Sequence, residues 1–166
     1  MKAAINVELL NPGIAYMSEK STIPAAKAAF LPAIRELVRA YQAFSAYSEA
    51  HVRQFDLTPA QFDVIATLGN TNGLSMGEIG EKTLITKGTL TGVIDRLIKK
   101  QLVLREIPED NRRNVIVQLT PQGQQIFEQS FPSHIAYLKE RFDQLNPTAI
   151  EALTTLLIQL KQVFQK

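Results

Sequence analysis

A short segment near the middle of the chain carries residue types that can bind a negatively charged surface. Its hydroxyl and ammonium side chains fall at the start of an expected helix, and they are Thr86, Lys87, Thr89 and Thr91. Free N–H groups and the positive end of the dipole at a helix start attract phosphate. Gly88 and Gly92 cost about 1 kcal/mol each relative to alanine inside a helix. We therefore favour close approach to another molecule as their role; the alternative is a tightly packed neighbouring helix.

A pair of arginines, Arg112 and Arg113, stands in a polar turn between two apolar stretches. We expect these stretches, Leu102–Ile107 and Val115–Leu119, to form two β-strands of a hairpin. Arginines at its tip can reach a minor groove of DNA or the phosphates beside it. Alternatively, the turn is solvated and neighbouring acidic residues balance its charge. Arg96, on the preceding helix, should position that helix on the DNA backbone or link it to the hairpin.

Two short helices are expected before this hairpin. Ser75 and Glu78 have the spacing of a capping box that opens a helix ending near Thr83, and Thr86 can cap a second helix ending near Lys100. This order is typical of a winged helix-turn-helix, which inserts the second helix into the major groove of DNA. We expect a mainly α-helical protein with a small β-hairpin wing. Its candidate DNA-binding residues are Ser75, Thr86, Lys87, Gly88, Thr89, Thr91, Arg96, Arg112 and Arg113.

Long helices are expected on both sides of this segment. The first becomes regular near Leu31, a second begins after Thr120 with a kink or break at Pro132, and the last begins after Asn146. Their apolar stripes can cover each other in one chain or build a two-fold dimer from two chains. The expected division is residues 1–23 as an N-terminal arm or extra dimer element, 24–56 and 121–166 as the N- and C-terminal dimerisation helices, and 57–120 as the winged helix-turn-helix domain.

The composition narrows the class of protein further. The chain has 166 residues, of which 45% are hydrophobic and 20% charged, which fits one globular domain with a sizeable core. The net charge is only +2, so a nucleic-acid surface must come from local clustering. The chain has no cysteine and no P-loop, zincin or dinucleotide motif, so we expect no enzyme, metal or cofactor. No apolar run approaches the roughly 20 residues that span a bilayer, and we expect a cytoplasmic protein.

Several stretches together resemble the MarR family of bacterial transcription regulators. They are Leu57–Phe62, Leu74–Ile79, Thr89–Leu97, and Asp110–Arg113 followed by Val115–Gly123. The resemblance implies a homodimer whose terminal helices form the interface. Each subunit would supply one winged helix to a pseudo-palindromic operator in double-stranded DNA. Such proteins are mostly repressors that small ligands release, often phenolic or other aromatic anions.

The wing departs from the family pattern at one position. The family usually has an aspartate directly before the arginine pair, where this chain has Asn111, and Asp110 stands one position earlier. In the family this acidic residue helps to hold the wing arginine. Either Asp110 takes that role, or Arg113 is held less firmly.

The resemblance also implies a ligand pocket between the dimer helices and the winged domain. Tyr41, His51, Phe62 and Arg96 are the candidates for its lining. The simpler alternative for His51 is a surface or helix-face histidine, and His134 lies outside any recognised motif. The chain has no cysteine and no tryptophan, which the family's peroxide-sensing and urate-responsive branches use.

A second function remains open for the same fold. A winged helix can serve as a protein-interaction module without specific DNA binding. Such a module keeps the apolar core but does not need Lys87, Arg96, Arg112 and Arg113 on one side. Binding to DNA through several phosphates predicts an affinity that falls steeply with salt concentration, which separates the two functions.

Overall fold

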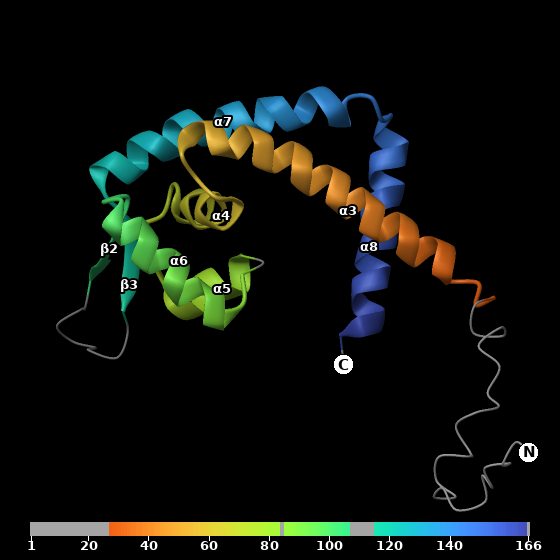
Figure 1. Cartoon of the computed structure of the whole chain (residues 1–166), viewed down its shortest axis with the longest axis horizontal. Helices are drawn as coiled ribbons and strands as arrows, with labels where there is room; N and C mark the ends of the chain where they lie inside the picture. The colour runs from red at the N-terminus through yellow and green to blue at the C-terminus, as the bar shows by residue number, and fades with distance from the viewer. Residues whose placement is uncertain (1–26, 84, 107–114, 166) are drawn as a thin grey trace, which may run out of the picture. The chain divides into compact units, whose positions relative to one another are not determined.

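The computed structural model describes residues 27–83, 85–106 and 115–165 (Figure 1). The chain divides into an N-terminal unit, Met1–Ala43, and a larger unit, Phe44–Lys166. No helix in the described ranges has both the length and the hydrophobicity that crossing a membrane requires. The predicted N-terminal arm lies outside the described residues.

Helix α3 (Leu31–Val52) and the short 3-10 helix η2 (Arg53–Phe55) precede the winged segment. α3 begins at Leu31, as predicted, and Pro32 occupies its first turn, where a missing N–H breaks no helical hydrogen bond. The chain turns at Asp56, whose φ of 55° is left-handed. Aspartate tolerates this conformation better than most residues do, so Asp56 can end η2 and lead into the next helix.

Three helices follow along the larger unit: α4 (Pro59–Leu68), α5 (Met76–Lys82) and α6 (Lys87–Lys99). α4 begins with a capping box between Thr58 and Gln61. Thr58 Oγ1 accepts a hydrogen bond from the backbone N–H of Gln61 (3.3 Å), and Gln61 Oε1 accepts one from the backbone N–H of Thr58 (3.0 Å). Each bond satisfies an N–H group that has no partner within the helix.

The predicted capping box at the start of α5 is also present. Ser75 Oγ accepts from the backbone N–H of Glu78 (3.2 Å), and Glu78 Oε2 accepts from the backbone N–H of Ser75 (2.8 Å). Hydrogen bonds from the backbone of Ser75, and secondly from its side chain, hold the pKa of the Glu78 carboxyl below its ordinary value. The carboxylate is therefore ionised at neutral pH, when it serves best as a cap.

A three-stranded antiparallel sheet completes the winged segment. Its strands β1 (Leu74–Ser75), β2 (Val103–Glu106) and β3 (Ile116–Leu119) lie in the order β1-β3-β2. The β2–β3 hairpin was predicted, whereas β1 was not, because two residues are too few to show an alternating pattern. In Figure 1 the hairpin lies beside α6. Gly73, with a φ of 105°, makes the turn into β1.

The inner face of the sheet packs against the helices. Val103 of β2 and Val117 of β3 are 2% and 0% exposed and join one buried cluster with residues of α4, α5 and α6. The members from these three helices are Val64, Ile65, Leu68, Ile79, Leu90, Val93, Ile94 and Leu97. This cluster fixes the helices and the root of the hairpin to one another.

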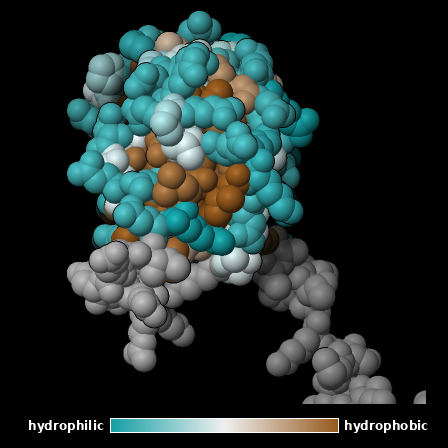
Figure 2. Space-filling view, turned by 90° about the vertical axis from the view of Figure 1, so that its left-hand side faces the viewer, coloured by the Kyte–Doolittle hydropathy of each residue, from teal (hydrophilic) through white to brown (hydrophobic). Residues whose placement is uncertain are grey.

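The outer face of the hairpin carries both apolar and polar side chains. Leu104, Glu106, Ile116 and Gln118 share this face in the strand register. Leu104 is 38% exposed, and Gln118 Nε2 donates a 2.8 Å hydrogen bond to Glu106 Oε2. Figure 2 looks at the side on which the hairpin lies and shows hydrophobic atoms at the surface, bordered by polar residues. The inner face, not this one, therefore holds the hairpin to the core.

Helix α7 (Pro121–Phe142) is one uninterrupted α-helix. Of the kink or break predicted at Pro132, the break is therefore wrong. Buried residues on both sides of the proline, Phe127 and His134 among them, pack the helix onto the rest of the unit, and Pro132 itself is exposed. Tertiary packing on both sides thus outweighs the loss of one backbone hydrogen bond.

The last helix, α8 (Pro147–Phe164), contributes no buried residue. It begins where predicted, with Asn146 Oδ1 accepting a hydrogen bond from the backbone N–H of Ala149 (2.8 Å). Its large apolar side chains are nevertheless numerous and exposed: Leu153, Leu156, Leu157, Ile158, Leu160, Val163 and Phe164. A helix with such a surface usually lies against another apolar surface.

Candidate nucleic-acid interface

The start of α6 presents a row of hydroxyl groups to solvent. Thr86 precedes the helix, and Thr86, Thr89 and Thr91 are all exposed. Thr86 Oγ1 donates to Thr89 Oγ1 (3.1 Å) and makes no capping hydrogen bond to the backbone. The Thr86 side chain therefore leaves the first N–H groups of the helix uncapped. Lys87 belongs to α6, but its side chain lies outside the described residues.

Gly88 and Gly92 face open space. A methyl group at either position would meet no heavy atom within 4 Å among the described residues beyond the helix's own turns. The alternative of a tightly packed neighbouring helix is therefore wrong. Nothing in the described part of the chain requires glycine at these two positions, so their small size is available for close approach by another molecule.

The opposite side of α6 is fixed in the core. Leu90, Ile94 and Leu97 recur at helical spacing and are at most 1% exposed. Two of their partners in the buried cluster, Ile65 and Leu68, come from α4. Because interiors are close-packed, α6 cannot rotate without disturbing α4, and its exposed face keeps a fixed direction.

An ion pair joins α6 to the hairpin. Arg105 Nη2 of β2 lies 2.8 Å from Asp95 Oδ1 of α6, with the two side chains 34% and 48% exposed. Sequence reasoning gave the link to Arg96, which is exposed and makes no ion pair among the described residues. Asp95 was missed because its partner stands on another element, and no local spacing relates the two. The position of the hairpin relative to α6 is thus set partly by charge.

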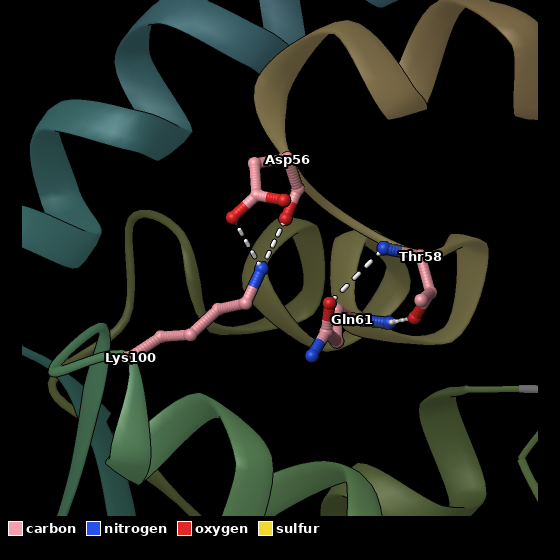
Figure 3. A network of polar contacts seen from close by, with 4 residues as sticks. All are labelled: Asp56, Thr58, Gln61 and Lys100. Atoms are coloured by element: carbon pink, nitrogen blue, oxygen red, sulfur yellow. Dashed lines mark hydrogen bonds and ion pairs between the residues drawn. The ribbon is translucent and has the colours of Figure 1, made fainter.

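A second polar contact holds the other end of α6 (Figure 3). Lys100 Nζ lies 2.7 Å from Asp56 Oδ2 and also donates to the backbone carbonyl oxygen of Asp56. As the figure shows, Asp56 precedes the capping box of Thr58 and Gln61 at the start of α4. The contact therefore ties the C-terminal end of α6 to the connection between α3 and α4.

The arginine pair of the wing, with Asp110 and Asn111, lies outside the described residues. Their contribution to DNA binding stays a prediction, and so does the question of which acidic residue holds Arg113. Ser75 is described, but its hydroxyl already accepts the capping bond. The oxygen of a hydroxyl has two lone pairs and can accept a second hydrogen bond, so Ser75 remains a candidate.

The predicted ligand residues are only partly brought together. Phe62 contacts His134 edge-on, with ring centroids 4.7 Å apart, and His134 in turn contacts His51. His51 is 7% exposed, so its interpretation as a surface histidine is wrong. Tyr41 belongs to the N-terminal unit and is 65% exposed. Arg96 makes no ring, hydrogen-bond or ion-pair contact with His51 or Phe62 in the described part of the chain.

The helix pair, the exposed start of α6 and the antiparallel hairpin define a winged helix-turn-helix DNA-binding protein. The MarR family model matches residues 57–115. The HTH-type transcriptional regulator MhqR of Bacillus subtilis is 30% identical over 121 residues, which cover 73% of this chain and 83% of MhqR. The chain belongs to the MarR family of transcriptional regulators.

Solved structures agree with this assignment. The BpsR protein of Bordetella bronchiseptica, whose DNA binding is regulated by 6-hydroxynicotinic acid, is 31% identical with a TM-score of 0.69. The likeness covers 78% of this chain and 98% of BpsR. A mutant of MarR from E. coli, solved with operator DNA, is 26% identical with a TM-score of 0.70, covering 82% of this chain and 96% of that one.

Proposed function

We propose that the protein is a homodimeric repressor that binds a pseudo-palindromic operator and is released by a small aromatic anion. The observation that carries the DNA-binding part is the exposed start of α6. There, hydroxyl side chains and two glycines face open space while the opposite side of the helix is fixed in the core. We expect α6 to enter the major groove, with Thr89 and Thr91 reaching base edges or phosphates. A repressor of this kind acts in the bacterial cytoplasm.

The homodimer is supported by the apolar surface of the terminal helices. Ile34, Leu37 and Val38 in α3 are 40% to 47% exposed, and the large apolar residues of α8 are exposed as well. Burial of apolar surface stabilises an assembly by about 25 cal/mol per Å². A second copy of the chain presents the same surfaces and can cover them around a two-fold axis. Two winged helices would then meet two half-sites of one operator.

Release by an aromatic anion is supported by the likeness to BpsR, which 6-hydroxynicotinic acid regulates. We propose Tyr41, His51, Phe62 and Arg96 as candidate ligand residues in this chain. Aromatic rings can stack on such a ligand, and the guanidinium of Arg96 can pair with a carboxylate. Weaker operator binding in the presence of 6-hydroxynicotinate, measured on purified protein, would support this part.

The DNA-binding part is tested by fluorescence anisotropy on the region upstream of the protein's own gene, at two salt concentrations and with unrelated DNA as competitor. We expect tight binding that survives the competitor and weakens with a slope of about −0.9 for each phosphate contacted. Arg113→Ala should weaken binding, because we place that residue in the wing. Equal, weak binding to both DNAs would favour the protein-interaction module instead.

A further inference from the structure

Two histidines that are far apart in the sequence meet inside the larger unit. His51 lies in the last turn of α3 and His134 in α7, and their Nδ1 atoms are 3.2 Å apart. The two residues are 7% and 4% exposed. His134 Nε2 lies 3.2 Å from Ser48 Oγ, and His51 Nε2 lies 3.4 Å from Ser133 Oγ. The four side chains form a continuous chain of hydrogen bonds between α3 and α7.

The hydrogen bond between the two rings has room for one proton. A neutral imidazole has one N–H donor and one acceptor nitrogen. The contact between Nδ1 atoms therefore requires that one ring donates and the other accepts. Each Nε2 then takes the complementary role toward its serine, whose hydroxyl can donate or accept. A second proton on each ring would place two Nδ1–H groups and two positive charges against each other.

The surroundings of the pair are mainly aromatic. Tyr137 stacks on His51 with ring centroids 4.3 Å apart, and Phe55 lies at 5.4 Å from the same ring. Phe62 of α4 contacts His134 edge-on. Burial first, and the neighbouring His51 second, hold the pKa of His134 below its ordinary value. His134 is therefore neutral at neutral pH, and a charge added to it is poorly solvated.

Several charged groups lie on the surrounding elements, and Glu140 of α7 is close enough to Tyr137 to raise the pKa of its phenol. Glu49 of α3 pairs with Arg53 of η2 at 2.6 Å. Arg141 of α7 lies over the ring of Tyr47, 5.0 Å from its centroid. Asp63 of α4 has an interaction of its own. The hydrogen bonds that His51 and His134 make among the described residues run from each imidazole to the other and to one serine hydroxyl.

Burial raises the pKa of the Tyr137 phenol. The Tyr137 ring that stacks on His51 therefore stays uncharged across the pH range in which histidine titrates. The remaining titratable partner of each imidazole is the other imidazole, and proton uptake is an event of the pair as a whole.

The pair lies where three helices meet. Phe62 connects it to α4, and α4 shares the buried cluster with α6. We propose that the His51–His134 pair is a proton-sensitive joint: proton uptake in mildly acidic solution separates α3 from α7, displaces α4 together with α6, and weakens operator binding. The inference rests on the proposed operator binding.

The direction of the pH effect follows from proton linkage. The unfolded chain binds a proton at histidine near pH 6.5, whereas His134 in the folded chain binds its proton only at lower pH. Neutral His134 therefore stabilises the fold fully above about pH 6.5, and this stability falls as the solution is acidified below that value. Simple electrostatics predicts the opposite for DNA affinity, because added positive charge strengthens binding to phosphate.

Anisotropy titrations of the full chain test the joint. The probe is a labelled duplex that the protein selects from a random pool, used at constant salt and at about pH 7.5 and about pH 5.5. We expect affinity to fall about tenfold on acidification, a common size for coupling between two sites. The chain has two histidines in all, so the variant His51→Gln/His134→Asn removes every imidazole. Its affinity should change by less than about twofold between the same pH values.

Imidazole proton NMR of the unmodified protein needs no variant and covers the case in which the double variant fails to fold. We expect at least one ring to titrate below about pH 6.5 and the affinity to follow that transition. If both rings titrate as exposed histidines do, or if affinity stays constant or rises on acidification, the joint is disproved while operator binding at about pH 7.5 stands. Failure to select any duplex at about pH 7.5 would instead contradict the proposed function, and the joint with it.

Discussion

Gly88 and Gly92 are the residues whose chemistry is least explained by the protein alone. Glycine destabilises a helix interior, and neither position has a neighbour in the described chain that would exclude a methyl group. A binding partner that approaches the backbone of α6 explains both observations. We therefore expect stability and DNA affinity to respond oppositely to a methyl group at either glycine.

Gly88→Ala tests this separation. We expect the free energy of unfolding to rise by about 0.5 to 1 kcal/mol, because alanine favours the helix. Operator affinity should fall by about tenfold, the effect of losing one good base contact. Denaturant unfolding and anisotropy measure the two quantities. Gly80→Ala in α5 is the control: its methyl group would lie 3.7 Å from Leu90 Cδ2, an ordinary contact, and it should leave affinity unchanged. If Gly88→Ala left the operator affinity unchanged, DNA would not approach the α6 backbone closely at this position.

Gly123, unlike Gly88 and Gly92, is required by the fold itself, because the backbone of Leu102 lies directly against it. A methyl group there would overlap the carbonyl oxygen of Leu102. Neither segment can yield by a side-chain rotation, so we expect Gly123→Ala to lower the free energy of unfolding by about 3 kcal/mol. Thermal or denaturant unfolding measures this loss. A variant as stable as the parent chain would show that the start of α7 does not approach Leu102 so closely.

At the scale of elements, the sequence predicted those elements whose stabilising contacts lie between residues close together in the chain. The start of α5 was predicted because Ser75 and Glu78 complete its capping box within one helical turn. Strand β1 was not, because its pairing with β3 joins Leu74 to Val117 across the chain. Long-range contacts leave no periodic pattern in a two-residue strand.

The same reasoning applies to the candidate site. The hydroxyl row and the glycines of α6 are adjacent in sequence, so their common role could be predicted. The histidine pair could not, because His51 and His134 stand on different helices and only the fold brings their rings together. The continuity of α7 through Pro132 has the same cause, since packing on both sides of the proline decides it.

Breaking the ion pair between α6 and β2 should weaken operator binding. Arg105→Gln removes the partner of Asp95 and should lower operator affinity about three- to tenfold, because the wing then loses its fixed position. Both side chains are partly exposed, so the free energy of unfolding should change by less than about 1 kcal/mol. Arg39→Gln is the control, since Arg39 pairs with Glu36 at an exposed site of α3. Equal affinities of the two variants would refute a positioning role.

At the scale of the whole molecule, the proposed binding to two half-sites requires two copies of the chain. The apolar residues of α8 are exposed and take no part in the core. The double variant Leu153→Lys/Leu157→Lys should therefore leave the winged helix folded but prevent dimerisation. Sedimentation at micromolar concentration should show a dimer for the parent chain and a monomer for the variant. Operator affinity should fall by about 100-fold, because the second half-site no longer adds to binding.

The polar side of α8 supplies the matched control for this test. Thr155 is exposed and lies about half a helical turn away from the substituted leucines. Thr155→Lys should therefore remain a dimer. A double variant that still sediments as a dimer would place the interface elsewhere.

The central claim is that this MarR-family protein reads a two-part DNA site. The most direct measurement is the affinity of the full chain for a duplex that it selects from a random pool, intact and with one half-site scrambled. We predict that scrambling one half-site lowers the affinity by about 100-fold, and that unrelated DNA does not compete with the intact duplex. Equal affinity for the intact, scrambled and unrelated duplexes would contradict the claim.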